Sequence, residues 1–75
     1  MTLADLKAGQ RARITTVDAN APGVVPLMTL GLVEGTPVAY RQCAIGGDPI
    51  ELDVMGAAIS VRLAQAASIT VELDA

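Results

Sequence analysis

Residues 50–63 read IELDVMGAAISVRL, two alternating apolar–polar segments on either side of a glycine. Such alternation is typical of β-strands with one buried face, and the glycine between them indicates a tight hairpin turn. We predict a two-residue turn at Gly56-Ala57, of the type that takes glycine first. A slip of one residue would turn the apolar side chains to solvent, so the buried face is well specified. The predicted register places Val54 opposite Ile59, Leu52 opposite Val61, Ile50 opposite Leu63, Asp53 opposite Ser60 and Glu51 opposite Arg62.

The segments around this hairpin extend the sheet. Residues 10–17 predict a first strand with Ala12, Ile14 and Thr16 on one face, and residues 38–44 predict a second. Alternating apolar residues from Ile69 predict the last strand, and turn formers fill residues 18–23 and 46–49. Five short strands predict a mostly β fold, a small and strongly bent barrel with one or two short helices.

Helical turns are predicted at three places. Thr2 and Asp5 have the spacing of a capping box, which begins a single turn over residues 3–7 that buries Leu3 and Leu6. A second helix is predicted over residues 24–30, with Pro26 at its first position. Gly31 stands where such a helix ends in a left-handed residue. A third turn is predicted at residues 64–67.

The second helix carries more apolar side chains than one face can hold. On barely two turns they cannot all point to one core. Some of them cap the barrel, or they form an exposed apolar patch of the kind that contacts a protein partner. The alternative is that all of them belong to the core. The candidate partner-binding residues are Val24, Val25, Leu27 and Met28.

Composition restricts the class of protein. The chain has 75 residues, five basic and eight acidic, with a net charge of −3. We therefore expect one domain over residues 1–75, and the scattered bases argue against nucleic-acid binding. No apolar run approaches the ~20 residues that a membrane span needs. The first residues lack the basic and apolar regions of a secretory signal. We expect a soluble, cytoplasmic protein that does not insert into the membrane.

Residues for catalysis are scarce. The chain has no histidine, one cysteine and no glycine-rich phosphate-binding motif. This excludes the Ser-His and Cys-His nucleophile arrangements and a thiolate metal cage, so we expect no enzyme, no cofactor and no catalytic or metal residues.

Two weaker site hypotheses concern acidic residues and the cysteine. A carboxylate site for ferrous iron could be assembled from Asp48, Glu51, Asp53 and Cys43, but alternation on a strand favours a solvated sheet face. Cys43 could be a reactive thiol, but a small structural strand residue is favoured.

In order along the chain, these features resemble the FeoA family of ferrous-iron transport proteins. The family pattern opens with Leu-x-x-Leu-x-x-Gly and has a strand that ends in Ile, a helix that closes on Leu-Gly-Leu with a spaced Gly, a Gly-Asp-Pro turn and a final Ala-x-x-Ile-x-Val. The matching residues are Leu3, Leu6, Gly9, Ile14, Leu30, Gly31, Leu32, Gly35, Gly47, Asp48, Pro49, Ala66, Ile69 and Val71. The chain departs from the pattern at Val25-Pro26, where relatives often carry Arg, and at residues 44–46, where they commonly have a proline.

The resemblance implies an SH3-like barrel that acts by contact. It implies a small cytosolic accessory protein of ferrous-iron uptake that binds the cytoplasmic GTP-binding domain of FeoB, the membrane transporter. The alternative is the regulatory SH3-like barrel of an iron-dependent transcriptional repressor. Such a barrel normally follows a helix-turn-helix and a metal domain. Since the sequence starts at Met1 and contains neither, we expect the first reading.

Overall fold

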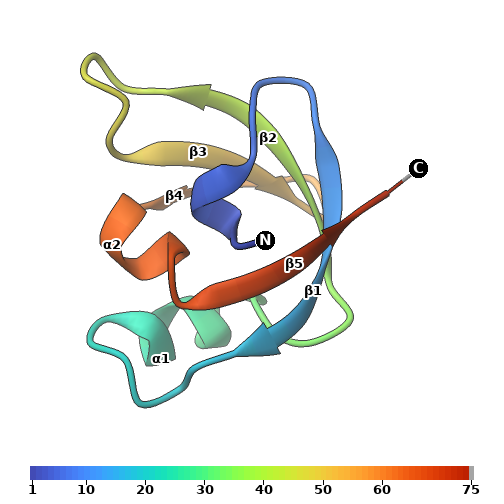
Figure 1. The fold of residues 1–75 in the computed structure, drawn as a ribbon, viewed down its shortest axis with the longest axis vertical. Helices are drawn as coiled ribbons and strands as arrows, with labels where there is room; N and C mark the ends of the chain where they lie inside the picture. The colour runs from blue at the N-terminus through green and yellow to red at the C-terminus, as the bar shows by residue number, and fades with distance from the viewer. Residues whose placement is uncertain (75) are drawn as a thin grey trace.

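Five antiparallel strands form one curved sheet in a computed structural model, which describes residues 1–74 (Figure 1). The strand order across the sheet is β4-β3-β2-β1-β5. The prediction of a mostly β, five-stranded fold with short helices is confirmed. The elements in chain order are η1 (Leu3–Asp5), β1 (Arg11–Val17), α1 (Val24–Thr29), β2 (Pro37–Cys43), β3 (Ile50–Val54), β4 (Ala57–Val61), α2 (Leu63–Ala66) and β5 (Ile69–Leu73).

The concave side of the sheet encloses an aliphatic core. Its largest fully buried side chains come from strands, helical turns and the connections between them, so most of the chain contributes. Burial at ~25 cal/mol per Å² of apolar surface is what stabilises a domain of this size. These side chains are Leu3, Ile14, Leu32, Leu52, Ile69, Val24 and Val61.

The bend of the sheet coincides with two irregularities in strand pairing. On β1, Ile14 pairs with Val71 and Thr16 with Thr70, so that Thr15 is an extra residue. A second shift lies between Tyr40 and Gln42 on β2. Bulges of this kind bend a strand and increase its twist. The first one also explains why Thr16 is exposed, although alternation predicted it on the same face as Ala12 and Ile14.

The β3–β4 hairpin forms with a different turn from the one predicted. Val54 pairs with Ala57, so the two turn residues are Met55 and Gly56, with φ of 53° and 90°. Two positive φ values in a two-residue loop define a type I′ turn. The register is therefore shifted by two residues, to Leu52 opposite Ile59, Ile50 opposite Val61, Glu51 opposite Ser60 and Asp53 opposite Ala58.

The apolar face survives this shift because side chains alternate with a period of two. Leu52 and Ile59 remain buried. The predicted Glu51–Arg62 pair is wrong, since the carboxylate of Glu51 accepts a hydrogen bond from Gln42. Arg62 instead lies 4.0 Å from Asp48.

The helical segments follow their predicted end signals with one correction. The capping box of η1 is present, with the Thr2 backbone N–H donating to Asp5 Oδ2 at 2.8 Å. Helix α1 begins after Gly23, so Pro26 is its third residue and not its first. The missing N–H of proline still falls within the first turn, where no helical partner exists for it. No helix in residues 1–74 has the length and hydropathy needed to cross a bilayer.

Candidate partner-binding surface

Helix α1 divides the four predicted partner-binding residues into two pairs. Val24 and Leu27 are buried, with 0% and 6% of their surface exposed, because positions three apart on a helix face the same side. Val25 is 56% exposed and Met28 is half-buried. As surface candidates, Val24 and Leu27 are therefore corrected to core residues, while Val25 and Met28 remain available for contact.

The end of α1 adds apolar surface that the sequence argument did not assign to a partner. Gly31, with a φ of 113°, ends the helix and allows the N–H of Leu32 to donate to the Leu27 carbonyl at 3.1 Å. This arrangement turns the chain so that Leu32 enters the core while Leu30 is left 59% exposed. Val33 follows on the surface.

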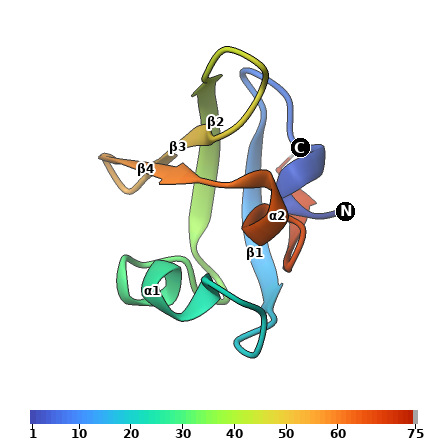
Figure 2. The same cartoon turned by 90° about the vertical axis from the view of Figure 1, so that its left-hand side faces the viewer.

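The β3–β4 turn lies next to this end of α1. A Cβ on Gly31 would stand 3.9 Å from Val54 Cγ1, one residue before Met55, which is 83% exposed. Figure 2 shows α1 and this turn on the same side of the molecule. Exposed apolar side chains gathered on one face are typical of interaction surfaces. We call the group of Val25, Met28, Leu30, Val33 and Met55 the α1–hairpin patch.

Sequence reasoning misses three members of this patch for identifiable reasons. Leu30 and Val33 belong to a glycine-containing stretch whose pattern indicates a bend in the chain and nothing about a partner. Met55 is missed because the predicted turn, Gly56-Ala57, begins one residue too late, which makes Met55 the last residue of a strand. The available signal is a large apolar residue directly before a turn glycine.

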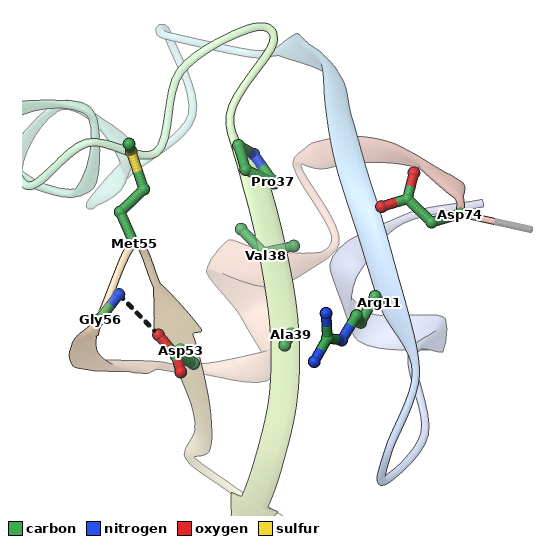
Figure 3. A pocket seen from close by; sticks show the side chains of 8 residues that line it. All are labelled: Arg11, Pro37, Val38, Ala39, Asp53, Met55, Gly56 and Asp74. Carbon is green, nitrogen blue, oxygen red and sulfur yellow. Dashed lines mark hydrogen bonds between the residues drawn. The ribbon is translucent and has the colours of Figure 1, made fainter.

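A shallow groove of about 230 Å³ borders the patch at Met55 (Figure 3). Its floor is the outer face of β2, and in the figure Arg11 and Asp53 lie on the two sides of that strand. The carboxylate of Asp53 is held by the backbone N–H of Gly56, at 2.9 Å. The groove offers apolar surface together with three charged side chains, those of Arg11, Asp53 and Asp74. The lining residues are Arg11, Pro37, Val38, Ala39, Asp53, Met55, Gly56 and Asp74.

The residues that could have formed a ferrous-iron site are not brought together. Asp48 Oδ1 accepts from the Leu63 N–H at 3.0 Å, and Glu51 and Asp53 are bound to Gln42 and Gly56. Across residues 1–74, no three His, Cys, Asp or Glu side chains are arranged to hold a metal ion. The carboxylates therefore act as local hydrogen-bond acceptors.

Cys43 is the last residue of β2, as expected for a strand residue, and it is exposed. A hydrogen bond with the Cys43 side chain raises the pKa of Tyr40, and burial of the phenol and the charge of the thiolate act in the same direction. The two side chains thus form a small polar contact at the surface of the sheet.

The family model and a curated relative identify the family of this chain. The model of the FeoA domain matches residues 1–73. The chain is 33% identical over 73 residues to the Fe(2+) transport protein A/Fe(2+) transporter FeoB fusion protein of Porphyromonas gingivalis. That match covers 97% of the chain but only 9% of the fusion protein.

Solved structures give the same fold. The solution structure of the FeoA protein from Chlorobium tepidum is 41% identical with a TM-score of 0.90, covering 100% of this chain and 71% of that one. The zinc complex of FeoA from Stenotrophomonas maltophilia, described as a procaryotic SH3 domain protein, is 26% identical with a TM-score of 0.78, covering 96% and 89%. The prediction of an SH3-like barrel is confirmed.

Proposed function

Because the chain belongs to the FeoA family, we propose that it is a small accessory protein of ferrous-iron uptake that binds the cytoplasmic GTP-binding domain of a FeoB-type transporter. It acts in the cytoplasm by contact and not as an enzyme. The observation that supports a FeoB-type partner most directly is the relative in which the A protein and FeoB are one polypeptide. Fusion keeps two components at high effective concentration, which is useful when they act on each other.

The α1–hairpin patch supports binding through a protein surface. Its exposed side chains are apolar and come from a helix end and a hairpin turn, both fixed by the core beneath them. Apolar anchors at the centre of an interface usually carry most of the binding free energy. We assign Leu30 and Met55 as anchors, with Val25, Met28 and Val33 around them.

Binding should be measured by calorimetry, with the purified cytoplasmic domain of the FeoB-type transporter from the same organism. We expect Leu30→Asp to weaken binding by about tenfold or more, since it places a charge in the apolar centre. Ile45→Asp is the matched control. Ile45 is a fully exposed aliphatic residue in the β2–β3 loop, and that loop lies at the opposite end of the molecule from α1 (Figure 1).

Wild-type protein that gives no heat with this domain would contradict the proposed function. Equal losses in the Leu30 and Ile45 variants would remove the α1–hairpin patch as the contact surface.

A further inference from the structure

We infer that Thr36 is a positioning residue of the α1–hairpin patch, which holds Leu30 and Val33 on the surface through a hydrogen bond to the turn between them. This inference rests on the proposed function and deepens it, because it assigns the geometry of that surface to a side chain outside the patch. Thr36 lies directly before β2, and the chain reaches it from the end of α1 (Figure 2).

Thr36 is the one polar residue that is buried within residues 1–74, with 9% of its surface exposed. Its hydroxyl Oγ1 donates to the Gly31 carbonyl at 2.9 Å. A buried hydroxyl costs stability unless it is hydrogen-bonded, and valine has almost the same shape without that requirement. What the hydroxyl adds at this position is therefore the bond to Gly31.

The carbonyl that accepts this bond lies at the centre of the turn that ends α1. The N–H groups of Gly31 and Leu32 donate to the last turn of the helix, at 3.0 and 3.1 Å, in the two bonds of a Schellman motif. The Gly31 carbonyl also accepts from the Val33 N–H at 2.9 Å. The orientation of this one carbonyl is thus tied to the chain direction that buries Leu32 and leaves Leu30 and Val33 exposed.

The backbone of Thr36 is fixed to the sheet. The Ile14 N–H on β1 donates to the Thr36 carbonyl at 3.0 Å, and the Ile14 carbonyl accepts from the Gly35 N–H at 2.7 Å. Arg13 Nη1 donates to the Gly35 carbonyl at 2.9 Å. Ile14 itself is 1% exposed. Thr36 therefore joins the sheet, through its backbone, to the end of α1, through its side chain.

This connection matters for binding because ordering a loop at an interface costs free energy. Leu30 and Val33 lie on a connecting segment, and such segments are more mobile than the elements that they join. A segment already held in one geometry avoids most of that cost when the partner arrives. Loss of the Thr36 hydroxyl should therefore leave the chain folded, allow residues 30–33 to open locally, and weaken binding.

The test compares Thr36→Val, which removes the hydroxyl and keeps the shape, with Thr36→Ser, which keeps the hydroxyl. Thr15→Val is the matched control, because the Thr15 hydroxyl also donates to a backbone carbonyl, that of Thr70 on β5, at 3.3 Å. Arg13→Met removes the second side-chain bond to the same loop by a change at an exposed residue. Each protein is measured by amide hydrogen exchange at residues 31–33 and by calorimetric affinity for the transporter's cytoplasmic domain.

We expect residues 31–33 of Thr36→Val to exchange about three- to tenfold faster than in the wild type, and the variant to bind about three- to tenfold more weakly, as the net contribution of one hydrogen bond allows. Exchange in β3 should not change. Thr36→Ser should restore both readouts, and Thr15→Val should match the wild type in both. Arg13→Met should accelerate exchange at residues 31–33 by a smaller factor.

Unchanged exchange at residues 31–33 in Thr36→Val, or in Arg13→Met if the valine variant does not fold, would overturn this inference. Faster exchange spread equally over β3 would also overturn it, since that marks a general loss of stability. Unchanged binding despite faster local exchange would do the same and leave the proposed function standing. Absence of wild-type binding to the domain would instead overturn the proposed function, and the exchange measurements would still decide whether Thr36 holds the loop.

Discussion

Gly23, at the start of α1, lies directly against the side chain of Gln65 in α2. A Cβ on Gly23 would stand 3.1 Å from Gln65 Cδ and still closer to the amide nitrogen, and the φ of Gly23 is +79°. At its other end α1 meets Val54 through Gly31. The start of α1, the helix that carries much of the α1–hairpin patch, is therefore tightly packed against α2, whereas Gly31 would leave room for a Cβ in ordinary contact with Val54.

Gly23→Ala should lower the free energy of unfolding by about 1–2 kcal/mol, because it combines left-handed strain with a steric conflict at Gln65. In a Gln65→Ala background the conflict is absent, and the cost should fall to the strain alone, ~1 kcal/mol. Chemical denaturation of the four proteins in this double-mutant cycle measures the difference. Equal costs in both backgrounds would show that Gln65 moves aside freely.

Neighbouring leucines at the end of α1 should respond differently to the same substitution. Leu27→Asp buries a carboxylate in the core and should lower the free energy of unfolding by about 3 kcal/mol or more, enough to unfold a small domain. Leu30→Asp changes an exposed side chain and should stay within ~0.5 kcal/mol of wild type. Thermal unfolding followed by circular dichroism would compare the stability of the two variants with that of the wild type. A large loss of stability in Leu30→Asp would mean that Leu30 is a structural residue.

The strands and their buried face are predictable because both depend on alternation, which is read directly from residue order. The turn at Met55-Gly56 is not, because methionine rarely takes a positive φ and glycine-first turns are equally consistent with the pattern. Nor does the sequence show that Val24 and Leu27 are buried while Val25 is exposed. In a helix of six residues, the side that faces the core depends on the residue at which the helix starts, and the sequence does not fix that residue. Leu30 is exposed because the positive φ of Gly31 turns the chain and sends Leu32, not Leu30, into the core. Most of the fold was therefore predictable from the sequence. The patch was not, because only the structure shows that the end of α1 lies beside the β3–β4 turn.

Met55→Asn should stabilise the protein while weakening its function. Asn-Gly is the preferred pair for a type I′ turn, so the free energy of unfolding should rise by about 0.5–1 kcal/mol. The same change removes an apolar side chain from the patch and should weaken binding to the transporter domain by about threefold or more. Denaturation and calorimetry on one preparation measure both effects. A variant that is more stable and binds normally would exclude Met55 from the interface.

Tyr40 provides a pH-dependent test of the contact with Cys43. The hydrogen bond from this contact raises the pKa of Tyr40 above its ordinary value of 10.0, with burial and the Cys43 thiolate acting in the same direction. The folded protein then holds the phenol proton at pH values where the unfolded chain has lost it. This contribution to stability is fully present below about pH 10, the ordinary tyrosine pKa, and is lost as the pH rises through the Tyr40 pKa of the folded state.

Cys43→Ala should therefore bring the pKa of Tyr40 back toward 10.0 and reduce the loss of stability above that pH. Tyr40 is the only aromatic residue of the chain, so ultraviolet absorbance of the phenolate reports its titration without interference. Cys43→Ser is the matched control, because its hydroxyl keeps a hydrogen-bonding group and carries no thiolate charge. It should give a Tyr40 pKa between those of the wild type and the alanine variant. Coincident titration curves for all three proteins would show that the two side chains do not interact in solution.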